Sequence, residues 1–450
     1  MLGPKKIIIL TSPYAGHCNP IFGVCSQLNK VETNTKILVF GDAKFKSLFE
    51  KCGAEFRLYP SSSLYDMISP KTDGFDLLVK GVDIANRNAT GMCQEILREK
   101  PDLILYDKGT CFPKFILEYV MIQYKKHSLS MFKLMGYSTT FQLDNEYPNE
   151  HERNAVGLKI GLKHVLTLVT YAKRKRDFNR KYGIQTPVFP FISNWEQLEH
   201  ETTVVFTFPQ LQARSHLRNA EKFKFVGSSL LESVHFNGIN DSNDESDELK
   251  ELLAEFPVRS HEMKLPAAHS YLVYVSLGTL FNTDALVFQT ILKALESVNA
   301  LRPLKAVIST GESCYDMLVR QRNDHNSLGN RVLLLKTAPQ IEMLKRASLF
   351  VTHSGMNSTS EAVHFGVPMI CLPMAVGLDQ PLVAYRVADE LGLGVRMKVK
   401  GLNQTELSQT MMKILTDESF YERALVYSDI SQKYNGIENT CKLICNALKN

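Results

Sequence analysis

The sequence predicts an α/β protein made of two doubly wound domains, each with a parallel β-sheet, that face each other across a cleft. Three observations lead to this prediction. The chain has 450 residues, which is more than one hydrophobic core usually supports. Short runs of β-branched residues alternate with longer amphipathic segments, a pattern typical of parallel sheets wrapped by helices. Each half of the chain also begins with a strand that runs into a turn of small residues.

Eight apolar runs are predicted to be strands of these two sheets. In the first half they are Ile7–Leu10, Lys36–Phe40 and Asp102–Tyr106. In the second half they are Leu272–Val275, Lys305–Ile308, Val332–Leu335, Leu349–Thr352 and Met369–Leu372. Ligands of such sheets bind beyond the C-terminal ends of the strands, so the residues that follow these strands are the first candidates for a functional site.

A polar, acidic stretch separates the two sets of strands. Residues 237–248 are almost free of core-forming side chains, and they fit a solvated linker better than a Ca²⁺ loop because the regular loop spacing is missing. We therefore divide the chain into a first domain of residues 1–227, a linker of residues 228–268, a second domain of residues 269–418, and a C-terminal helical segment of residues 419–450.

Composition and charge narrow the class of protein. The formal net charge of +5 is small for this length and does not favour a nucleic-acid partner. The basic run Lys173–Arg176 is interpreted as a solvated helix face rather than an anionic-membrane patch. Nine scattered cysteines without a C-x-x-C pair favour reduced thiols in the cytoplasm over disulfides or a zinc site. We also expect a monomer with no signal peptide and no transmembrane anchor.

The segment from Ser348 to Glu361 carries the strongest functional signal. The strand Leu349–Thr352 leads through a turn of small residues to a helix N-terminus, where unbonded peptide N–H groups and the helix dipole favour a phosphate. His353, Asn357 and Glu361 are spaced four residues apart, which predicts that they stack on one helical face. That face would offer a phosphate donor, an amide and a carboxylate for sugar hydroxyls, in the order that a nucleotide requires.

The residues around this segment extend the pattern. They are Ala338-Pro339-Gln340, Gly366-Val367-Pro368, Asp379-Gln380-Pro381 and Leu391-Gly392-Leu393-Gly394. Together with His353 to Glu361, this series resembles the donor-binding signature of the UDP-dependent glycosyltransferases, most of all the soluble bacterial macrolide and plant small-molecule members. The resemblance implies the two-Rossmann architecture called GT-B, with an acceptor-binding first domain, a UDP-sugar-binding second domain, and a final helix that crosses back to the first domain.

The resemblance also implies a donor site. Its residues would be Gly278, Thr279, Ala338, Gln340, His353, Gly355, Asn357, Ser358, Glu361, Asp379 and Gln380. His353 with Asn357 and Ser358 would surround the diphosphate, while Gln340 and Glu361 would bind the ribose. A helix N-terminus with a histidine can offset the charge on departing UDP, so we expect no metal and no cofactor beyond the UDP-sugar itself.

Within the same resemblance, three further groups would complete the donor contacts. The Ala338 backbone would meet the uracil edge, and Asp379 with Gln380 would bind the transferred sugar. Gly278 and Thr279 would allow the backbone to approach the nucleotide closely.

A second constellation lies in the first half of the chain. The strand Ile7–Leu10 runs into residues 14–20, which resemble the family's G-H-x-N-P element, and the resemblance makes His17 the general base. An imidazole also suits proton abstraction near neutral pH, because its unperturbed pKa is about 6.5. Asp107 follows the strand Asp102–Tyr106 and is predicted to orient His17 and to stabilise the imidazolium that forms.

Two features depart from the family pattern. The tryptophan that commonly stacks on uracil is replaced by Thr337, and the single tryptophan of this chain is Trp195. The segment from Pro373 to Asp379 is slightly longer than in the family. These departures bear on base stacking and on the role of Asp379.

The sequence thus predicts an inverting, metal-independent enzyme that transfers a sugar, expected to be glucose, from a UDP-sugar to a hydroxyl of a lipophilic small molecule, in detoxification or secondary metabolism. Taken together, Phe75, Phe112, Met131, Phe132 and Met135 favour an apolar acceptor pocket, whereas any one of them alone is better explained by ordinary core packing. Two alternatives stay open, because fold alone does not decide function. One is a sugar-nucleotide epimerase of the same fold, and the other is a catalytically silent protein that binds sugar nucleotides or hydrophobic ligands.

Overall fold

A computed structural model describes residues 3–32, 34–61, 74–141, 161–188, 198, 201–212, 221–230, 247–259, 271–279, 283–324, 331–375 and 379–449. The chain divides into two compact units. The first unit contains residues 1–236 and 434–450, and the second contains residues 237–433. Each unit is built on its own parallel sheet, which confirms the predicted α/β class with two doubly wound domains.

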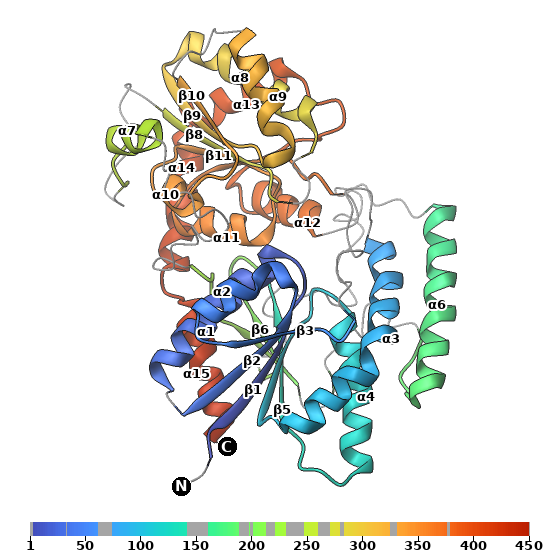
Figure 1. Ribbon diagram of the computed structural model, residues 1–450. Coiled ribbons are helices and arrows are strands. Elements are labelled where there is room, and N and C mark those ends of the chain that lie inside the picture. The colour runs from blue at the N-terminus through green and yellow to red at the C-terminus, as the bar shows by residue number, and fades with distance from the viewer. Residues whose placement is uncertain are drawn as a thin grey trace. The chain divides into compact units, whose positions relative to one another are not determined.

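The sheet of the first unit has, among the described residues, seven strands in the order β3-β2-β1-β4-β5-β6-β7 (Figure 1). The strands are β1 (Lys5–Leu10), β2 (Thr35–Gly41), β3 (Glu55–Leu58), β4 (Leu103–Asp107), β5 (Lys133–Ser138), β6 (Thr202–Val205) and β7 (Phe223–Phe225). Every pair is parallel, and β1 pairs with both β2 and β4. The strand order therefore reverses between β1 and β4, and this switch point is where ligands of doubly wound sheets bind.

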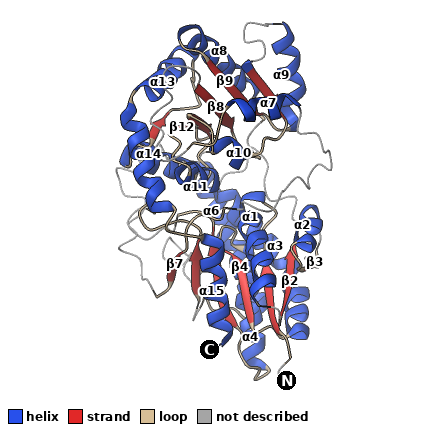
Figure 2. Ribbon diagram, turned by 90° about the vertical axis from the view of Figure 1, so that its left-hand side faces the viewer, coloured by secondary structure: helices blue, strands red, loops and turns tan. Residues whose placement is uncertain are grey.

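Helices cover both faces of this sheet, as Figure 2 shows with the strands in red between blue helices. The helices are α1 (Ala15–Val31), the 3₁₀ turn η1 (Ala43–Phe45), α2 (Lys46–Lys51), α3 (Gly74–Glu99), α4 (Phe112–Lys126), α6 (Leu162–Tyr182) and α15 (Gly436–Lys449). Successive residues of β1 face opposite sides, because side chains alternate along a strand. Ile8 and Leu10 pack in the core with α3 and α4, whereas Ile7 and Ile9 pack in the core with α1 and α15.

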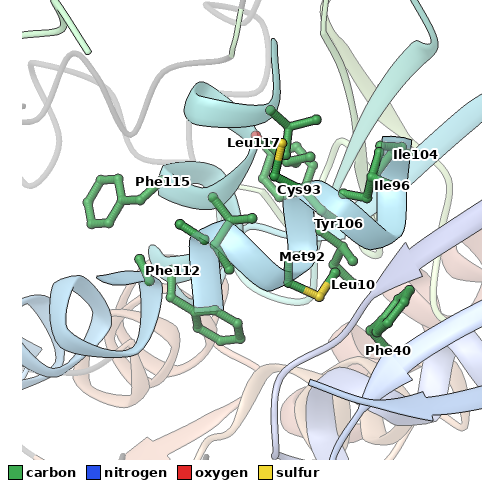
Figure 3. Close-up of a cluster of buried hydrophobic side chains, with 14 of the residues drawn as sticks. Leu10, Phe40, Met92, Cys93, Ile96, Ile104, Tyr106, Phe112, Phe115 and Leu117 are labelled. Carbon is green, nitrogen blue, oxygen red and sulfur yellow. The ribbon is translucent and has the colours of Figure 1, made fainter. Parts of the chain in front are cut away.

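The core beneath α3 and α4 joins strands and helices that are distant in sequence. Figure 3 shows Leu10 and Phe40 from two strands beside Met92 of α3, together with Ile104 and Tyr106 of β4. All five side chains are buried, and each buried aliphatic or aromatic side chain contributes about 1.5–3 kcal/mol of transfer free energy. This core holds β1 and β4 side by side and so fixes the loops that follow them.

The C-terminal helix α15 belongs to the first unit. It packs against α1, and its residues Cys441 and Ile444 are buried in the same cluster as Val24. Helix α14 (Glu418–Ser431), which precedes it, packs against α11 (Met356–His364) of the second unit. The return of the final helix to the first unit is thus made by α15, while α14 stays with the second unit.

The sheet of the second unit has, in the part of the chain described, the order β10-β9-β8-β11-β12-β13. Its strands are β8 (Tyr271–Ser276), β9 (Leu304–Ser309), β10 (Val332–Leu335), β11 (Leu349–Thr352), β12 (Met369–Cys371) and β13 (Gly394–Arg396). The other helices of this unit are α7 (Asp247–Glu255), α8 (Ala285–Leu301), α9 (Glu312–Asp324), α10 (Gln340–Leu344), α12 (Gln380–Ala384), the π-helical turn η5 (Tyr385–Glu390) and α13 (Gln404–Thr416). The strand order reverses between β8 and β11, which is the switch point of this sheet.

All eight predicted strands are present, each within one or two residues of its expected bounds. The structure adds β3, β5, β6, β7 and β13, which are short, half-polar, or both. Most of the predicted linker, residues 228–268, lies outside the described residues, and α7 is a helix within it.

None of the described helices is long and apolar enough to cross a membrane. All nine cysteines are free thiols.

Candidate active site

His17 lies at the C-terminal edge of the first sheet. Strand β1 ends at Leu10, the backbone of Tyr14 is extended at the N-cap position, and α1 begins at Ala15. His17 is therefore in the first turn of α1, directly beyond the end of β1. Its side chain is 24% exposed, so one part of the ring is held by the protein while another part reaches solvent.

Asp107 is the last residue of β4, the strand that pairs with β1 at the switch point. The register aligns Leu10 with Tyr106, so the residues that follow these two strands emerge together. The Asp107 Oδ2 atom lies 2.8 Å from His17 Nδ1, and the carboxylate is fully buried. The structure therefore brings together the two residues that the sequence analysis selected as base and orienting group.

Three groups that the sequence analysis did not identify also hold this carboxylate. The Ser12 hydroxyl donates to Asp107 Oδ2, and the Gly109 backbone N–H donates to Oδ1 at 2.8 Å. The Thr110 hydroxyl lies 2.6 Å from Ser12 Oγ. A buried carboxylate is costly unless it is hydrogen-bonded, and these donors compensate for its lost water.

Space around His17 is restricted as well. A Cβ atom added at Gly109 would lie 2.2 Å from His17 Cε1, so only a residue without a side chain leaves the ring in place. On another side, the Tyr14 ring makes an edge contact with the His17 ring, with 5.4 Å between centroids. The imidazole is thus fixed by packing as well as by its hydrogen bond to Asp107.

In the second unit, β11 leads into α11 through a three-residue turn, as predicted. Ser354 in this turn has φ +63°, a left-handed conformation that costs a residue with a side chain about 1 kcal/mol or more. Gly355 is the extended N-cap of α11, which begins at Met356. The first N–H groups of α11 therefore open toward the turn, as an anion site requires.

His353 does not stack on the face of α11, so that part of the prediction is wrong. The residue precedes the helix, because the left-handed Ser354 turns the chain before α11 starts, and only Asn357 and Glu361 share the helical face. The His353 ring lies instead between two glycines. A Cβ atom at Gly278 would lie 2.7 Å from the ring, and one at Gly355 would lie 2.4 Å from Nε2.

Burial lowers the pKa of His353 to about 4, although a hydrogen bond to the Ser276 backbone partly offsets this effect. The imidazole is therefore neutral at pH 7. Toward a phosphate it can act as an N–H donor, with the positive potential supplied by the helix N-terminus.

A chain of polar side chains links α10 to α11. Gln340 donates to Ser358 Oγ at 3.1 Å and to Glu361 Oε2, while Tyr274 OH lies 3.4 Å from Gln340 Oε1. Burial raises the pKa of Glu361 to about 7, and the hydrogen bond from Gln340 opposes this rise. The structure thus brings Gln340 and Glu361, the two residues expected at the ribose, into contact with each other and with Ser358, which is expected at the diphosphate.

The remaining donor-site candidates lie around this group. Gly278 follows β8 with φ +80°, and Thr279 after it is exposed. Ala338 is buried just ahead of α10, and Thr337 beside it is exposed. Trp195, the only tryptophan, lies outside the described residues.

Gln380 and Asp379 begin helix α12. The Gln380 side-chain oxygen accepts from the backbone N–H groups of Met374 and Ala375, each at 2.9 Å. Asp379 is the N-cap residue of α12 and is half-buried. Gln380 therefore holds the backbone of Met374 and Ala375 with its oxygen and keeps its amide hydrogens for other partners.

Three of the five residues named for the acceptor pocket, Met131, Phe132 and Met135, line one cavity, but Phe75 and Phe112 do not, so the full set does not form a single pocket. Phe112 and Phe132 lie in one core of the first unit and Met135 lies in the other, because each points into a helix–sheet layer. Met131 is exposed just before β5, at the edge of the sheet opposite His17. Phe75 is half-buried and its ring lies 5.0 Å from that of His164.

Other apolar side chains do lie beside the Asp107 loop. Leu78, Val79 and Cys111 are partly buried hydrophobic residues, and the Cys111 thiol contacts the Leu78 carbonyl at 4.0 Å. A Cβ atom at Gly81 would lie 2.2 Å from Cys111 Sγ, which shows how closely α3 meets this loop. The first turns of α3 therefore contribute apolar surface beside this loop.

Comparisons with known proteins agree with this fold. The profile of the family described as UDP-glucoronosyl and UDP-glucosyl transferase matches residues 264–435. An uncharacterised UDP-glucosyltransferase of Bacillus subtilis is 25% identical over 99% of this chain and 98% of its own length. An NDP-glycosyltransferase of the same organism is 24% identical over 93% of this chain and 91% of its own length.

Solved structures show the same architecture. A UDP-glucose: anthocyanidin 3-O-glucosyltransferase in complex with UDP has a TM-score of 0.70 at 17% identity and covers all of both chains. The calicheamicin glycosyltransferase CalG4 has a TM-score of 0.69 at 20% identity, over 100% of this chain and 99% of its own. The fold is therefore that of the GT-B glycosyltransferases. Together with the relatives and the profile that matches residues 264–435, it supports a sugar-transferring enzyme of the UDP-dependent glycosyltransferase kind.

Proposed function

We propose that this enzyme transfers glucose from UDP-glucose to a hydroxyl of a lipophilic small molecule, with inversion and without a metal ion, to give a β-O-glycoside. The observation that carries the proposal is the contact of His17 Nδ1 with the buried Asp107 carboxylate at 2.8 Å. We place the reaction in detoxification or secondary metabolism and in the cytoplasm, carried out by a single chain. Nine free thiols support a reducing compartment.

The chemistry proposed for His17 follows from its contact with Asp107. A carboxylate accepts a hydrogen bond from Nδ1–H, which leaves Nε2 as the nitrogen that takes a proton. In the proposed step, Nε2 removes the acceptor hydroxyl proton and the acceptor oxygen bonds to the anomeric carbon. The bond from that carbon to the diphosphate breaks, and UDP leaves with the electron pair. A single displacement of this kind converts an α-linked donor to a β-glycoside.

The second unit supports the donor half of the proposal. The N-terminus of α11 supplies peptide N–H groups and a positive dipole end for the diphosphate, and neutral His353 adds a further donor. Glu361 and Gln340 form a hydrogen-bonded pair suited to vicinal ribose hydroxyls. Glucose as the sugar is supported by the name of the Bacillus subtilis relative, a UDP-glucosyltransferase.

A lipophilic acceptor is supported by the surroundings of the Asp107 loop. Leu78, Val79 and Cys111 are apolar and partly buried there, and α3 packs closely against the loop. Such a surface favours an apolar molecule whose single hydroxyl reaches His17.

Mass spectrometry of the reaction products tests the proposal. UDP-glucose is incubated with a panel of phenolic and terpenoid alcohols in the presence of a chelator, using wild type, His17→Ala and the control His127→Ala. His127 is an exposed histidine at the end of α4. We expect a hexose adduct with wild type and His127→Ala, and its loss with His17→Ala.

Two other results would contradict the proposal. Conversion of the donor sugar without any acceptor would identify an epimerase. Binding of UDP without an adduct, from UDP-glucose, UDP-galactose, UDP-N-acetylglucosamine or UDP-glucuronate, would identify a silent binding protein.

A further inference from the structure

Helix α6 presents apolar side chains to solvent along one face. Leu162, Val165, Leu166 and Val169 are 76%, 47%, 59% and 61% exposed. Their spacing of three and four residues places them on the same side of the helix. Scattered exposed apolar residues are normal, but four neighbours on one helical face form a contiguous patch, which marks an interaction surface.

The same face continues into basic residues. Lys173, Arg176 and Arg180 follow Val169 at helical spacing, and all three are exposed. The outer face of α6 thus consists of an apolar first half and a basic second half. We use the name outer face of α6 for these seven residues.

The opposite side of α6 fixes this orientation. Tyr171, Phe178 and Tyr182 are buried toward the rest of the first unit, where α6 packs along α3 (Figure 1). Lys175 is buried with them, 2.8 Å from Glu118 and with its ammonium group 4.0 Å from the centre of the Phe115 ring. The helix therefore cannot turn its apolar stripe inward without breaking this packing and a buried ion pair.

Charge is concentrated on α6. The helix contains seven lysines and arginines and one acidic residue, Asp177, whereas the whole chain has a formal net charge of only +5. Neighbouring carboxylates take up part of this charge, as Arg174 pairs with Asp83 and Arg180 with Asp177. Lys173 and Arg176 lie on the outer face, so the face remains basic at its C-terminal half.

We propose that the outer face of α6 docks the protein on an anionic membrane surface. The apolar half enters the boundary between headgroups and acyl chains, and the basic half contacts lipid phosphates. Amphipathic helices bind at the membrane plane through this combination of apolar area and attraction to anionic lipid. A second copy of the chain fits less well, because it would bring its own cations against the cations or the apolar half of the first. Of the basic run, Lys173 and Arg176 would contact the lipid, whereas Lys175 stays buried against Glu118 and Arg174 pairs with Asp83.

Docking of this kind would concentrate the enzyme where lipophilic molecules accumulate. The inference itself does not depend on the proposed transfer reaction, because it rests on the exposure, spacing and charge of α6.

Co-sedimentation of the full-length protein with vesicles tests the inference. One set of vesicles is phosphatidylcholine alone, and in the other phosphatidylglycerol replaces roughly a third of it. Two face variants are compared with wild type, Leu162→Ser with Leu166→Ser and Lys173→Glu with Arg176→Glu. We expect binding to the anionic vesicles, at least tenfold weaker partition for each face variant, and weaker binding at about 0.5 M salt.

Matched control variants show whether vesicle binding requires the outer face of α6 or only exposed leucines and lysines in general. Leu286→Ser with Leu301→Ser removes two highly exposed leucines of α8, and Lys46→Glu with Lys442→Glu reverses two exposed lysines elsewhere. Both controls are expected to partition like wild type. Circular dichroism and thermal melting verify that every variant is folded.

Three results would overturn the proposal. The first is equal or absent sedimentation with the two kinds of vesicle. The second is partition that the face variants leave unchanged. The third is a dimer in analytical ultracentrifugation that the face variants dissociate, since this would assign the face to a second copy of the chain.

Discussion

The orientation of the Asp107 carboxylate is set by individual hydrogen bonds. Its two carboxylate oxygens accept from His17, Ser12 and the Gly109 backbone, and the group has no exposed surface. A carboxylate held in this way keeps one orientation toward the imidazole, which a general base needs from its partner.

Removal of the Ser12 hydroxyl tests this arrangement. The Ser12→Ala variant leaves the buried carboxylate with one donor fewer. This loss costs about 1–3 kcal/mol, which in the transition state corresponds to a rate decrease of roughly 5- to 150-fold. We expect kcat to fall in this range while KM for UDP-glucose stays the same, as measured by steady-state kinetics. Thr11→Val is the control, because the Thr11 hydroxyl is buried nearby but donates to the Phe40 carbonyl. Equal effects of the two substitutions would contradict a role for Ser12 through Asp107.

Glu361 gives a prediction about pH. Burial raises its pKa in the folded protein to about 7 from an ordinary value of 4.5. Its contribution to stability is fully present below pH 4.5 and is lost as pH rises through 7, because ionisation of the buried group is unfavourable. Glu361→Gln stays neutral, so its unfolding free energy relative to wild type should increase between pH 4.5 and 8 by about 1–3 kcal/mol. Urea unfolding across this range measures the difference, and a constant difference would show that Glu361 has an ordinary pKa.

The sequence predicted the positions of some residues of the site and missed those of others. His17 and Asp107 each follow an apolar run, so their position at a strand end could be predicted. Ser12, Gly109 and Thr110 could not, because their contacts depend on the register of β1 with β4, two strands about ninety residues apart in sequence. The position of His353 outside the helix also depended on a feature without a sequence signal, the left-handed backbone of Ser354.

At the scale of elements, the turn between β11 and α11 depends on glycines from two different segments. The His353 ring lies against Gly278, which follows β8, and against Gly355, which caps α11. Parallel pairing of β8 with β11 brings these segments together. The shape of the predicted phosphate site is therefore a property of the switch point as a whole.

Gly278→Ala tests this dependence. Its Cβ atom would displace the His353 ring, so we expect UDP affinity, measured by isothermal titration calorimetry, to fall at least about tenfold. Gly401→Ala is the matched control, because Gly401 has φ +82° against +80° for Gly278 but nothing within 4 Å of an added Cβ atom. Both variants place an alanine at nearly the same positive φ. A similar loss of UDP affinity in the two would indicate strain and not displacement of His353.

A strand could be predicted from the sequence where nearly all of its residues are buried. The predicted strands, such as β1 and β8, are buried over most of their length and rich in β-branched or aromatic residues. β7 and β13 have three residues each, and β3 alternates polar with apolar residues, so their pairing comes from the neighbouring strand and not from their own pattern.

At the scale of the whole molecule, helix α15 follows the second unit in the sequence but belongs to the first unit. Ile444 of α15 is fully buried in the core that also contains Ile7 and Ile9 of β1. The stability of the first unit therefore depends on residues that follow the second unit in the sequence.

Substitution of Ile444 should separate the two units in stability. Ile444→Ala leaves a cavity that costs about 2–5 kcal/mol, and we expect hydrogen exchange to accelerate in β1 and α1 but not in β8 and α8. Asn446→Ala, at an exposed position of the same helix, is the control. Equal acceleration in both units would mean that they unfold as one.

The central claim is that His17 removes the acceptor proton. A general base contributes most when the acceptor hydroxyl is weakly acidic, so the most direct measurement is kcat/KM of wild type and His17→Ala with two acceptors of similar shape, an alcohol and a thiophenol. We predict a loss of about 10²–10⁴-fold for the alcohol and a much smaller loss for the thiophenol, which is largely ionised without a base. An equal loss for both acceptors would contradict the claim and would leave His17 with a structural role.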